Sequence, residues 1–412
     1  MGIGIVIPVW NLWDKMTFPC LQSLLKHTNL NDIHVYLVDN ASTDKTATHA
    51  EKIGQSLFGA SRFTYIKNQE NMGFAIACNQ GAEQAKKDGH AYILFLNNDT
   101  VVTAAWLPPL VNALENPRVG MVGPLLLFPD KTVQHCGVTV TPIQQVGHIY
   151  HGFLPAHPAV LRKRKFRIIT GAVLLCRTEQ FFALGKFFEG YKNGMEDIDL
   201  CYTYVEQGFM HQVVSESIVY HYTSQTEGRL DGVAGLQNGK LLLERKPQII
   251  PDAHLYYVQD GYLPALTKDF VFYPRLSEEK RKELNKAVLS SYSDELCKEL
   301  LLKEPFWHDG YQIFIKSLLK QGKVSDAFAY CQRAISYCFS ERNLKLLLEL
   351  AQTLNDEKIY EDVKSVTLKQ LAEMKEKKII HEQKFHQLMQ GNKWHDKLLA
   401  TRELDTDEFG IY

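Results

Sequence analysis

The N-terminal part of the sequence alternates short apolar runs with amphipathic stretches, and this alternation constrains the fold more than any other feature. The apolar, β-branched runs predict strands at Ile3–Val9, His34–Val38, Phe63–Lys67 and Ala91–Leu96. The stretches between them predict helices at Cys20–His27, Thr43–Leu57 and Gly73–Lys87. Strands and helices that alternate at this spacing form βαβ units around a mostly parallel sheet with helices on both faces. Ligands of such sheets bind beyond the carboxyl ends of the strands.

The rest of the chain changes character twice. The α/β pattern loosens after residue 119 but continues, with further strands predicted at Met121–Phe128, Val138–Val140 and Ile168–Cys176. Residues 231–275 are rich in proline and show no clear period, whereas Lys, Glu and Leu dominate at helical spacing from 276 onward. At roughly 150 residues per domain, a chain of this length holds two or three domains. We therefore expect an α/β domain over 1–230, an irregular linker over 231–275 and an all-α domain over 276–412.

One segment of the helical part is similar to the second half of a tetratricopeptide repeat. In Gln321–Ser336, the residues Ala327, Tyr330 and Ala334 stand where that repeat has two small residues flanking an aromatic one. Small residues at these positions let the two helices of a repeat pack closely. Such repeats need about three copies to be stable alone, and one copy is clear. A tetratricopeptide-like appendage and a generic helical bundle both stay open, and either offers a surface for a homodimer.

Composition excludes some classes of protein. The chain has 46 basic and 47 acidic residues among 412, a formal net charge of −1. A nucleic-acid binder relies on a surplus of positive charge, so we expect no nucleic-acid partner. The eight cysteines are scattered without a CxxC pair, as in reduced cytosolic proteins. No apolar run approaches the roughly 18 residues of a spanning helix, and the N-terminal run lacks the features of a signal peptide. We expect a cytoplasmic protein, free or peripheral at the inner face of the cell membrane.

Two carboxylates directly follow predicted strands. Asp99 ends the polar run Asn97-Asn98-Asp99, and Asp39 opens the segment Val38–Asp44. The carboxylate of Asp99 suits Mg²⁺ or Mn²⁺, with substrate phosphates filling other coordination positions. The carboxylate of Asp39 suits hydrogen bonds from a ribose hydroxyl or a base N–H. Both segments are also rich in turn-forming and helix-capping residues, so a structural interpretation stays open for each.

Two further groups of residues suit acid–base or metal chemistry. Glu196 and Asp197, with Asp199 close behind, lie among aromatic residues, and neighbouring carboxylates raise each other's pKa values enough to supply a general base. An acidic first turn of a helix, favoured by the helix dipole, is the structural alternative. His221 lies at the end of an apolar predicted strand and offers a nitrogen ligand that would complete a metal site with Asp99. A structural role is the alternative for this histidine.

The order and spacing of these segments resemble glycosyltransferase family 2, whose members use nucleotide sugars and have the GT-A fold. The resemblance covers residues 2–230 and leaves the second half of the chain out. The segments that carry it are Pro8–Asn11, Val38–Asp44, Asn71–Ala75 with Asn79 and Gly81, Tyr92–Thr100, Thr170–Ala172, Glu196–Cys201 and His221. A Rossmann-type dehydrogenase is excluded because no GxGxxG follows the first strand.

The resemblance implies a role for each matched residue. The nucleotide-sugar site would contain Pro8, Val9, Asn11, Asp39, Asn71, Gly73, Asn97, Asn98 and Gly171. Asn97-Asn98-Asp99 would stand for the DxD motif of the family, although Asn97 replaces its first aspartate. Asp99 and His221 would hold Mn²⁺ or Mg²⁺, and the diphosphate of the donor would supply much of the remaining coordination. Asp197, with Glu196, would supply the catalytic base.

The activity that the resemblance implies is inverting glycosyl transfer. A UDP- or dTDP-sugar would donate a hexosyl or deoxyhexosyl group to a hydroxyl of a glycan or a lipid-linked glycan, in cell-surface polysaccharide synthesis. A protein O-glycosyltransferase whose helical domain docks the protein acceptor is one alternative. A non-catalytic scaffold with a degenerate transferase fold is another, supported by Asn97 alone.

The basic run Arg162–Arg167 leaves three interpretations open. It is a solvated mobile loop, part of a lid over the donor diphosphate, or a contact to an anionic lipid or lipid-diphosphate acceptor. We favour the solvated loop.

Overall fold

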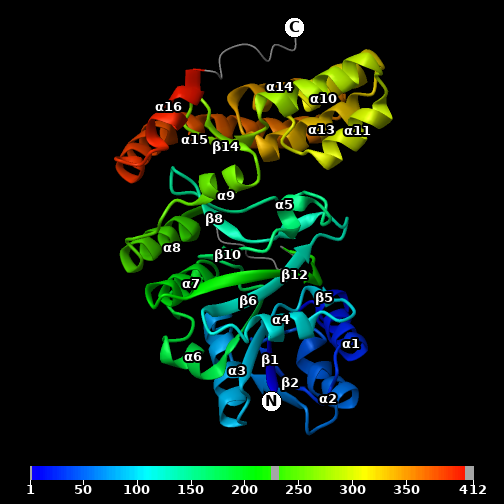
Figure 1. The fold of residues 1–412 in the computed structure, drawn as a ribbon. Coiled ribbons are helices and arrows are strands. Elements are labelled where there is room, and N and C mark those ends of the chain that lie inside the picture. The colour runs from blue at the N-terminus through cyan, green and yellow to red at the C-terminus, as the bar shows by residue number, and fades with distance from the viewer. Residues whose placement is uncertain (1, 224–231, 404–412) are drawn as a thin grey trace. The chain divides into compact units, whose positions relative to one another are not determined.

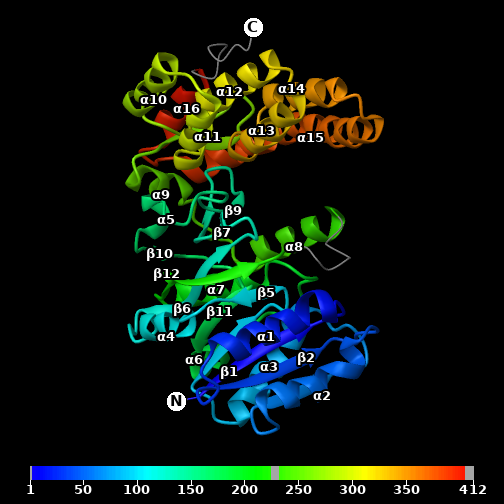
Figure 2. The same cartoon turned by 90° about the vertical axis from the view of Figure 1, so that its right-hand side faces the viewer.

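The computed structural model describes residues 2–223 and 232–403, and the chain divides into two compact units. The first unit comprises Met1–Thr139 and His148–Ile249, and the second comprises Val140–Gly147 and Ile250–Tyr412. Figures 1 and 2 show the first unit as a sheet covered by helices and the second as an array of helices. The short segment Val140–Gly147 therefore belongs to the second unit, and the chain returns to the first unit at His148.

A mixed sheet forms the centre of the first unit. Its strands are β1 (Ile3–Val9), β2 (Ile33–Asp39), β3 (Phe63–Lys67), β4 (Tyr92–Leu96), β5 (Thr100–Val102), β6 (Val119–Leu127), β7 (Val133–His135), β10 (Lys165–Phe166), β11 (Val173–Arg177) and β12 (Met210–His221). Within the described residues these ten strands run in the order β10-β12-β6-β11-β4-β1-β2-β3, with β5 paired to β12 and β7 paired to β6. The first four predicted strands are confirmed, and β1 pairs in parallel with both β2 and β4. Because β4, β1, β2 and β3 are parallel, their carboxyl ends meet at one edge of the sheet.

Helices cover both faces of this sheet (Figure 2). The helices of the first unit, within the described residues, are η1 (Trp13–Thr17), α1 (Phe18–His27), α2 (Thr46–Phe58), α3 (Phe74–Lys87), α4 (Leu107–Ala113), α5 (Pro158–Leu161), α6 (Thr178–Ala183), α7 (Glu196–Glu206) and α8 (Gly232–Arg245). The short strands β8 (Val138–Val140) and β9 (Val146–His148) pair with each other. The predicted α/β class with its mostly parallel core is confirmed, and the antiparallel strand β11 joins the parallel half to β6 and β12.

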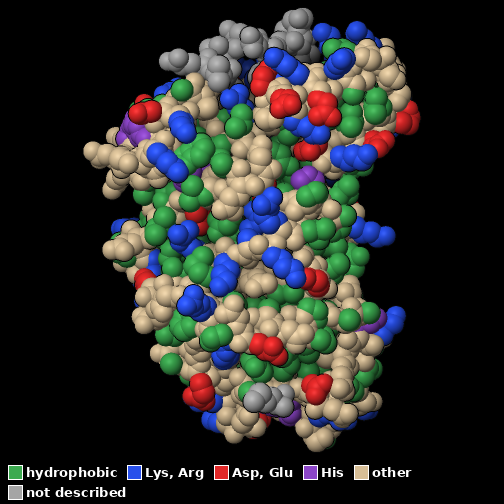
Figure 3. Space-filling model, viewed as in Figure 1, with side chains coloured by type: hydrophobic (Ala, Val, Ile, Leu, Met, Phe, Trp, Pro, Cys, Tyr) green, Lys and Arg blue, Asp and Glu red, His purple; other side chains and the backbone are tan. Residues whose placement is uncertain are grey.

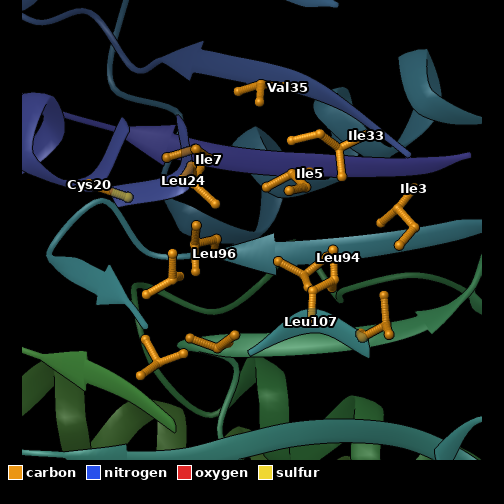
Figure 4. Close-up of a cluster of buried hydrophobic side chains, with 14 of the residues drawn as sticks. Ile3, Ile5, Ile7, Cys20, Leu24, Ile33, Val35, Leu94, Leu96 and Leu107 are labelled. Carbon is orange, nitrogen blue, oxygen red and sulfur yellow. The ribbon is translucent and has the colours of Figure 1, made fainter. Parts of the chain in front are cut away.

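Alternation along the strands decides which helices cover which face. Ile3, Ile5 and Ile7 of β1 belong to one buried cluster with residues of α1, α2 and α4, and Figure 4 shows them beside Leu94 and Leu96 of β4. Val6 points to the opposite face, against α3. A Cβ on Gly81 of α3 would lie 2.4 Å from the Val6 side chain, so the glycine permits this close packing. The sheet is therefore buried on both faces, as its continuous apolar strands predict.

The second unit is almost entirely helical. Its elements are α9 (Ala253–Gln259), β13 (Leu263–Leu266), β14 (Phe272–Arg275), α10 (Glu278–Ser290), α11 (Asp294–Lys303), α12 (His308–Lys320), α13 (Val324–Tyr337), α14 (Glu341–Thr353), α15 (Glu357–Met389) and α16 (His395–Glu403). A predicted all-α region after residue 276 is confirmed. Helices α10, α11, α14 and α15 begin after Ser277, Ser293, Ser340 and Asp356, whose side chains accept backbone N–H groups of the first turn.

Residues 231–275, which we expected to be an irregular linker, contain regular elements instead. Helix α8 lies in the first unit, and α9 with the hairpin β13–β14 lies in the second. The prolines suggested a linker, but two of them, Pro264 and Pro274, lie opposite each other in this two-stranded hairpin. A proline is tolerated there because an isolated pair of strands leaves positions that need no N–H donor. The division between the two units falls at Ile249–Ile250.

The repeat-like segment forms a helix that packs against its predecessor. Helices α12 and α13 are in contact, and Ala327 and Ala334 of α13 are buried. The ring of Tyr330 meets Phe314 of α12 edge-on, with 4.6 Å between the ring centroids. These three residues therefore lie on the face of α13 that packs against its neighbours, and the tetratricopeptide-like character of the segment stays a prediction.

Replacing Leu94 by Ala will test the packing of the central strand. Leu94 is fully buried on β4, so the change leaves a cavity and we expect a loss of about 2–5 kcal/mol in the free energy of unfolding of the first unit. Urea denaturation followed by circular dichroism measures this loss. The control is Leu25→Ala on α1, where the side chain is 36% exposed and we expect a change below about 1 kcal/mol. Equal losses from the two variants would contradict this description of the core.

Candidate active site

The predicted nucleotide-site residues of β1 and β2 lie at the carboxyl edge of the sheet and are tied together there. Pro8 and Val9 end β1 opposite Val38 and Asp39 of β2. Asn11 follows with a positive φ of 60°, and its backbone N–H donates to Ser42 Oγ at 2.8 Å. Its Oδ1 accepts the Thr43 N–H at 2.8 Å. The loop after the first strand is thus held against the loop after the second.

Asp39 is fully buried, and both of its carboxylate oxygens accept hydrogen bonds from the protein. Oδ1 accepts the Ser42 N–H at 2.8 Å, and Oδ2 accepts the Tyr65 hydroxyl at 2.5 Å. Burial, together with this carboxylate, raises the pKa of Tyr65 well above its ordinary value, so the phenol remains the donor. A nucleotide contact from Asp39 must use the remaining lone pairs of these oxygens or displace Tyr65.

Asn40, a residue that the sequence did not single out, organises the third loop of this edge. Its amide nitrogen donates to Asn71 Oδ1 at 2.8 Å and to the Gly73 carbonyl at 3.2 Å. Its amide oxygen accepts the Met72 N–H at 2.9 Å. Gly73 has a φ of 85°, which favours glycine, and it precedes α3. Asn71 and Gly73 therefore lie on the same edge as Asp39.

The three residues of the polar run after β4 contact three different parts of the first unit. The Asn97 backbone N–H donates to the Ala172 carbonyl at 2.8 Å, which joins this run to the start of β11. The Asn98 amide donates to Thr17 Oγ1 at 2.9 Å, so it is directed to η1. Asp99 faces His221 instead, because Thr100 of β5 pairs with His221 at the end of β12.

Asp99 and His221 form a pair that fits a divalent cation. Asp99 Oδ1 lies 3.1 Å from His221 Nε2, and the two side chains are 14% and 9% exposed. Asp99 Oδ1 is buried without a hydrogen-bond partner in residues 2–223 and 232–403. Two neighbouring ligands of an octahedral cation, each at about 2.1 Å, lie about 3.0 Å apart, and oxygen with imidazole nitrogen suits Mn²⁺ or Mg²⁺. No group of three His, Cys, Asp or Glu residues that could hold a metal occurs in the described part of the chain.

Glu196 and Asp197 begin α7 and face different surroundings. Glu196 is buried, and its Oε2 accepts the Gly194 N–H at 2.6 Å. Burial and the neighbouring Asp197 raise the pKa of Glu196 to about 7. Asp197 is partly exposed, and its Oδ2 accepts the Gly171 N–H at 2.8 Å while burial raises its pKa. A Cβ on Gly171 would lie 3.1 Å from the Asp197 Cβ, so the glycine permits this approach. The acidic first turn and the candidate base are therefore the same residues.

The backbone before α7 is held in a strained shape by residues that the sequence analysis missed. Asn193, Gly194 and Met195 all have positive φ, at 48°, 128° and 79°. A non-glycine residue in this region costs on the order of 1 kcal/mol, so neighbouring contacts must enforce it. Asn238 of α8 does so by donating to the carbonyls of Lys192 and Gly194 at 3.1 and 3.0 Å. The Asn193-Gly194 dipeptide was the available sequence signal for a turn here.

Two further contacts connect this loop to its surroundings. Asn193 Oδ1 accepts the Phe74 N–H at 3.1 Å, which links the start of α7 to the start of α3. Arg245 at the end of α8 donates to the buried Asp199 at 2.5 Å and lies over the Phe188 ring, 3.5 Å from its centroid. The acidic turn is therefore anchored from both sides.

The basic run that follows α5 is in part regular structure. Lys165 and Phe166 form the edge strand β10, and Lys163 pairs with Glu216 at 2.7 Å, so the run is not a free loop throughout. Figure 3 shows Lys and Arg side chains gathered over the α5–β10 segment. None of the helices in the described part of the chain has the length and hydrophobicity that a membrane-spanning helix requires.

Glu196→Gln will show how the buried carboxyl contributes to stability. Because the folded-state pKa of Glu196 is about 7 against an ordinary 4.5, the folded protein holds this proton more tightly than the unfolded chain. The contribution of the Glu196 carboxyl to the free energy of unfolding is therefore greatest below about pH 4.5. Relative to the variant, the free energy of unfolding of the wild type falls by about 3 kcal/mol as the pH rises through 7. Chemical denaturation from pH 4.5 to 8 measures the difference. A difference that does not change with pH, or that grows in favour of the wild type, would contradict this assignment.

Comparison with known proteins agrees with this geometry. Residues 4–152 match the sequence model of glycosyl transferase family 2. The chain is 28% identical over 263 residues to the O-antigen biosynthesis protein RfbC of Myxococcus xanthus, which covers 62% of this chain but 20% of that protein. It is 28% identical over 241 residues to an N-acetylglucosaminyl-diphospho-decaprenol L-rhamnosyltransferase of Mycobacterium tuberculosis, covering 51% of this chain and 74% of that enzyme.

A solved structure shares the fold. The crystal structure of GalNAc-T7 with UDP, GalNAc and Mn²⁺ superposes with a TM-score of 0.50 at 18% identity, covering 59% of this chain and 48% of that one. The strand order around β4, β1 and β2, the polar ends of these strands and the family match point to the same conclusion. Residues 4–152 therefore match glycosyltransferase family 2, and the first unit has the GT-A fold.

Proposed function

We propose that this chain is an inverting, divalent-metal-dependent glycosyltransferase that uses a UDP- or dTDP-sugar. The observation that carries the proposal is the Asp99–His221 pair. Its spacing fits two ligands of one cation, and Asp99 Oδ1 is buried without a hydrogen-bond partner among the residues that the structure describes. The loop that contains Asn97 is joined to the strand that begins after Gly171, and Gly171 is hydrogen-bonded to Asp197. The candidate metal ligands and the candidate base thus belong to one edge of one sheet.

The nucleotide would lie on the loops after β1, β2 and β3. Pro8, Val9 and Asn11 supply one wall, and Asn71 and Gly73 supply the other, with Asn40 fixing the distance between them. Gly73 leaves open backbone beside the site because it has no side chain. Asp39 supports this pocket from beneath, through the Ser42 N–H and Tyr65.

A Mn²⁺ or Mg²⁺ ion held by Asp99 and His221 would neutralise the charge that develops on the diphosphate leaving group. Among the described residues the protein offers two ligands there, so the diphosphate oxygens would complete the coordination. Asn97 and Asn98 add no charge, so the site carries less negative charge than a full DxD motif and repels the diphosphate less.

Asp197 is the better placed of the two carboxylates to act as general base. Glu196 is buried and occupied with the Gly194 N–H, whereas Asp197 is partly exposed and keeps free lone pairs beside its two backbone donors. Asp197 takes the proton of the acceptor hydroxyl as that oxygen forms a bond to the anomeric carbon, and the bond from this carbon to the diphosphate breaks. One displacement of this kind inverts the anomeric configuration, whereas a retaining route needs a carboxylate nucleophile.

The acceptor class follows from the relatives. One matched protein is named for O-antigen biosynthesis, and another for transfer of rhamnose to an N-acetylglucosaminyl-diphospho-decaprenol. We therefore propose a glycan or lipid-linked glycan acceptor in cell-surface polysaccharide synthesis. The chain spans a fifth of the first relative and about three quarters of the second, so this assignment applies to the shared domain.

Thermal shifts with nucleotides and metal will test the donor site. We expect UDP or dTDP, or their sugars, to raise the melting temperature only when Mn²⁺ is present. A ligand at about 100 times its Kd adds about 2.7 kcal/mol to the free energy of unfolding. Asp99→Asn should remove the metal dependence. The control is Asp130→Asn, in a turn where Asp130 accepts the Thr132 N–H, and this variant should keep the metal dependence. No shift with any of these ligands in a folded sample would favour the non-catalytic scaffold.

Asp197→Asn will test the proposed base. The asparagine keeps an oxygen for the Gly171 N–H but cannot take a proton, so we expect kcat to fall by about 10²–10⁴-fold. Release of nucleoside diphosphate from the donor with the largest thermal shift measures this fall. The control is Glu206→Gln at the other end of α7, whose carboxylate pairs with Lys246. Near-normal kcat in a folded Asp197→Asn variant would eliminate Asp197 as the base.

A further inference from the structure

Gln134 is a buried polar residue to which the sequence analysis gave no role. It lies in the middle of β7, between Val133 and His135, and its side chain is buried. Strand β7 pairs with β6, and β6 also pairs with β12, the strand that ends at His221. The topology therefore brings Gln134 to the end of β12 although it is remote from His221 in the sequence.

Within the part of the chain that the structure describes, the Gln134 side chain makes two hydrogen bonds, both to His221. Its Nε2 donates to the His221 carbonyl oxygen at 3.0 Å, and its Oε1 lies 2.6 Å from His221 Nδ1. A carbonyl oxygen can only accept, so the amide nitrogen must be the atom that faces it. The orientation of the amide group is therefore fixed by the backbone, and its oxygen must face the imidazole ring.

This orientation fixes the protonation of the ring. An amide oxygen is only an acceptor, so Nδ1 of His221 carries the proton in their hydrogen bond. A neutral imidazole with a proton on Nδ1 has its lone pair on Nε2. That nitrogen lies 3.1 Å from Asp99 Oδ1, an atom that also has only lone pairs to offer when ionised. Two acceptors face each other, which is unfavourable unless a cation or a proton lies between them.

We propose that Gln134 is a positioning residue that holds His221 as its Nδ1-protonated tautomer, so that Nε2 is available to the divalent cation. This inference rests on the proposed function, since it assigns a task in the same metal site. The backbones of Asp99 and His221 are held together by contacts that do not involve Gln134. His221 pairs with Thr100, and the Tyr222 N–H donates to the Asp99 carbonyl at 2.9 Å. Gln134 therefore acts on the ring. Without Gln134, the imidazole proton would move to Nε2 and form a hydrogen bond to Asp99. Neither His221 Nε2 nor Asp99 Oδ1 would then be available to the cation.

Variants at position 134 separate this task from a structural one. Gln134→Met has a similar length but no hydrogen-bonding group, so it releases the ring. Gln134→Glu retains an acceptor for Nδ1 and loses the donor to the carbonyl. The control is Thr103→Val, which removes a 2.7 Å side-chain hydrogen bond to the Ile218 carbonyl of the same strand β12 without touching His221.

The first readout is the tautomer of His221 in ¹⁵N-histidine NMR spectra of the full chain, with the signal identified by its loss in His221→Asn. We expect Nδ1 to carry a proton in the wild type, Gln134→Glu and Thr103→Val, whereas in Gln134→Met the proton should shift from Nδ1 to Nε2. The same tautomer in Gln134→Met and in the wild type would overturn the proposal, because the ring would then be fixed by something else.

The second readout is Mn²⁺ affinity, measured by the electron paramagnetic resonance signal of free Mn²⁺, with and without UDP. Loss of the residue that orients a ligand typically costs about 10–100-fold in metal affinity, and we expect this loss in Gln134→Met but not in Thr103→Val. Gln134→Glu should stay nearer to the wild type. Unchanged affinity in Gln134→Met overturns the inference. No Mn²⁺ binding by the wild type overturns the metal site of the proposed function instead, and the tautomer result then decides separately whether Gln134 controls the ring.

Discussion

The pairing of β5 with β12 is the interaction on which the candidate site depends. Thr100 lies opposite His221 in this short antiparallel ladder, and the Tyr222 N–H donates to the Asp99 carbonyl. This contact joins the parallel half of the sheet, which ends in the Asn97–Asp99 run, to the half that contains β6, β7 and β12. Without it, a carboxylate and an imidazole from distant parts of the chain would not share one edge. Among the described residues Asp99 Oδ1 is buried without a hydrogen-bond partner, an arrangement that a positively charged neighbour would stabilise.

Amide side chains connect the loops along the rest of this edge. Asn11 joins the loops after β1 and β2, Asn40 joins the loops after β2 and β3, and Asn193 joins the starts of α3 and α7. Asparagine suits this task because its side chain both donates and accepts. The strained backbone before α7 is stabilised in the same way by Asn238. The loops of this edge are thus connected largely by neutral amide groups, and the charged pair Arg245–Asp199 adds to them beside α7.

The sequence predicts the fold of the first unit well because its strands are continuous apolar runs, and Asp39 and Asp99 stand where those runs end. It predicts the environment of these residues less well. Asp39 is buried against Tyr65, and no local pattern indicates a partner on another strand. Gln134 lies in a three-residue strand, too short for a period to be visible, and its importance depends on the pairing of β6 with both β7 and β12. The regular elements of 231–275 were missed because prolines in an isolated hairpin resemble those of a linker.

The central claim is that Asp99 and His221 jointly hold a divalent cation at the carboxyl edge of the sheet. Crystals grown with UDP and Mn²⁺, with diffraction data collected at an X-ray energy where manganese scatters anomalously, test this claim most directly. We expect an anomalous peak within bonding distance of both Asp99 Oδ1 and His221 Nε2, with the diphosphate of UDP on its open side. Bound UDP with no peak there, or a peak whose protein ligands are other residues, would show that Asp99 and His221 do not form the metal site.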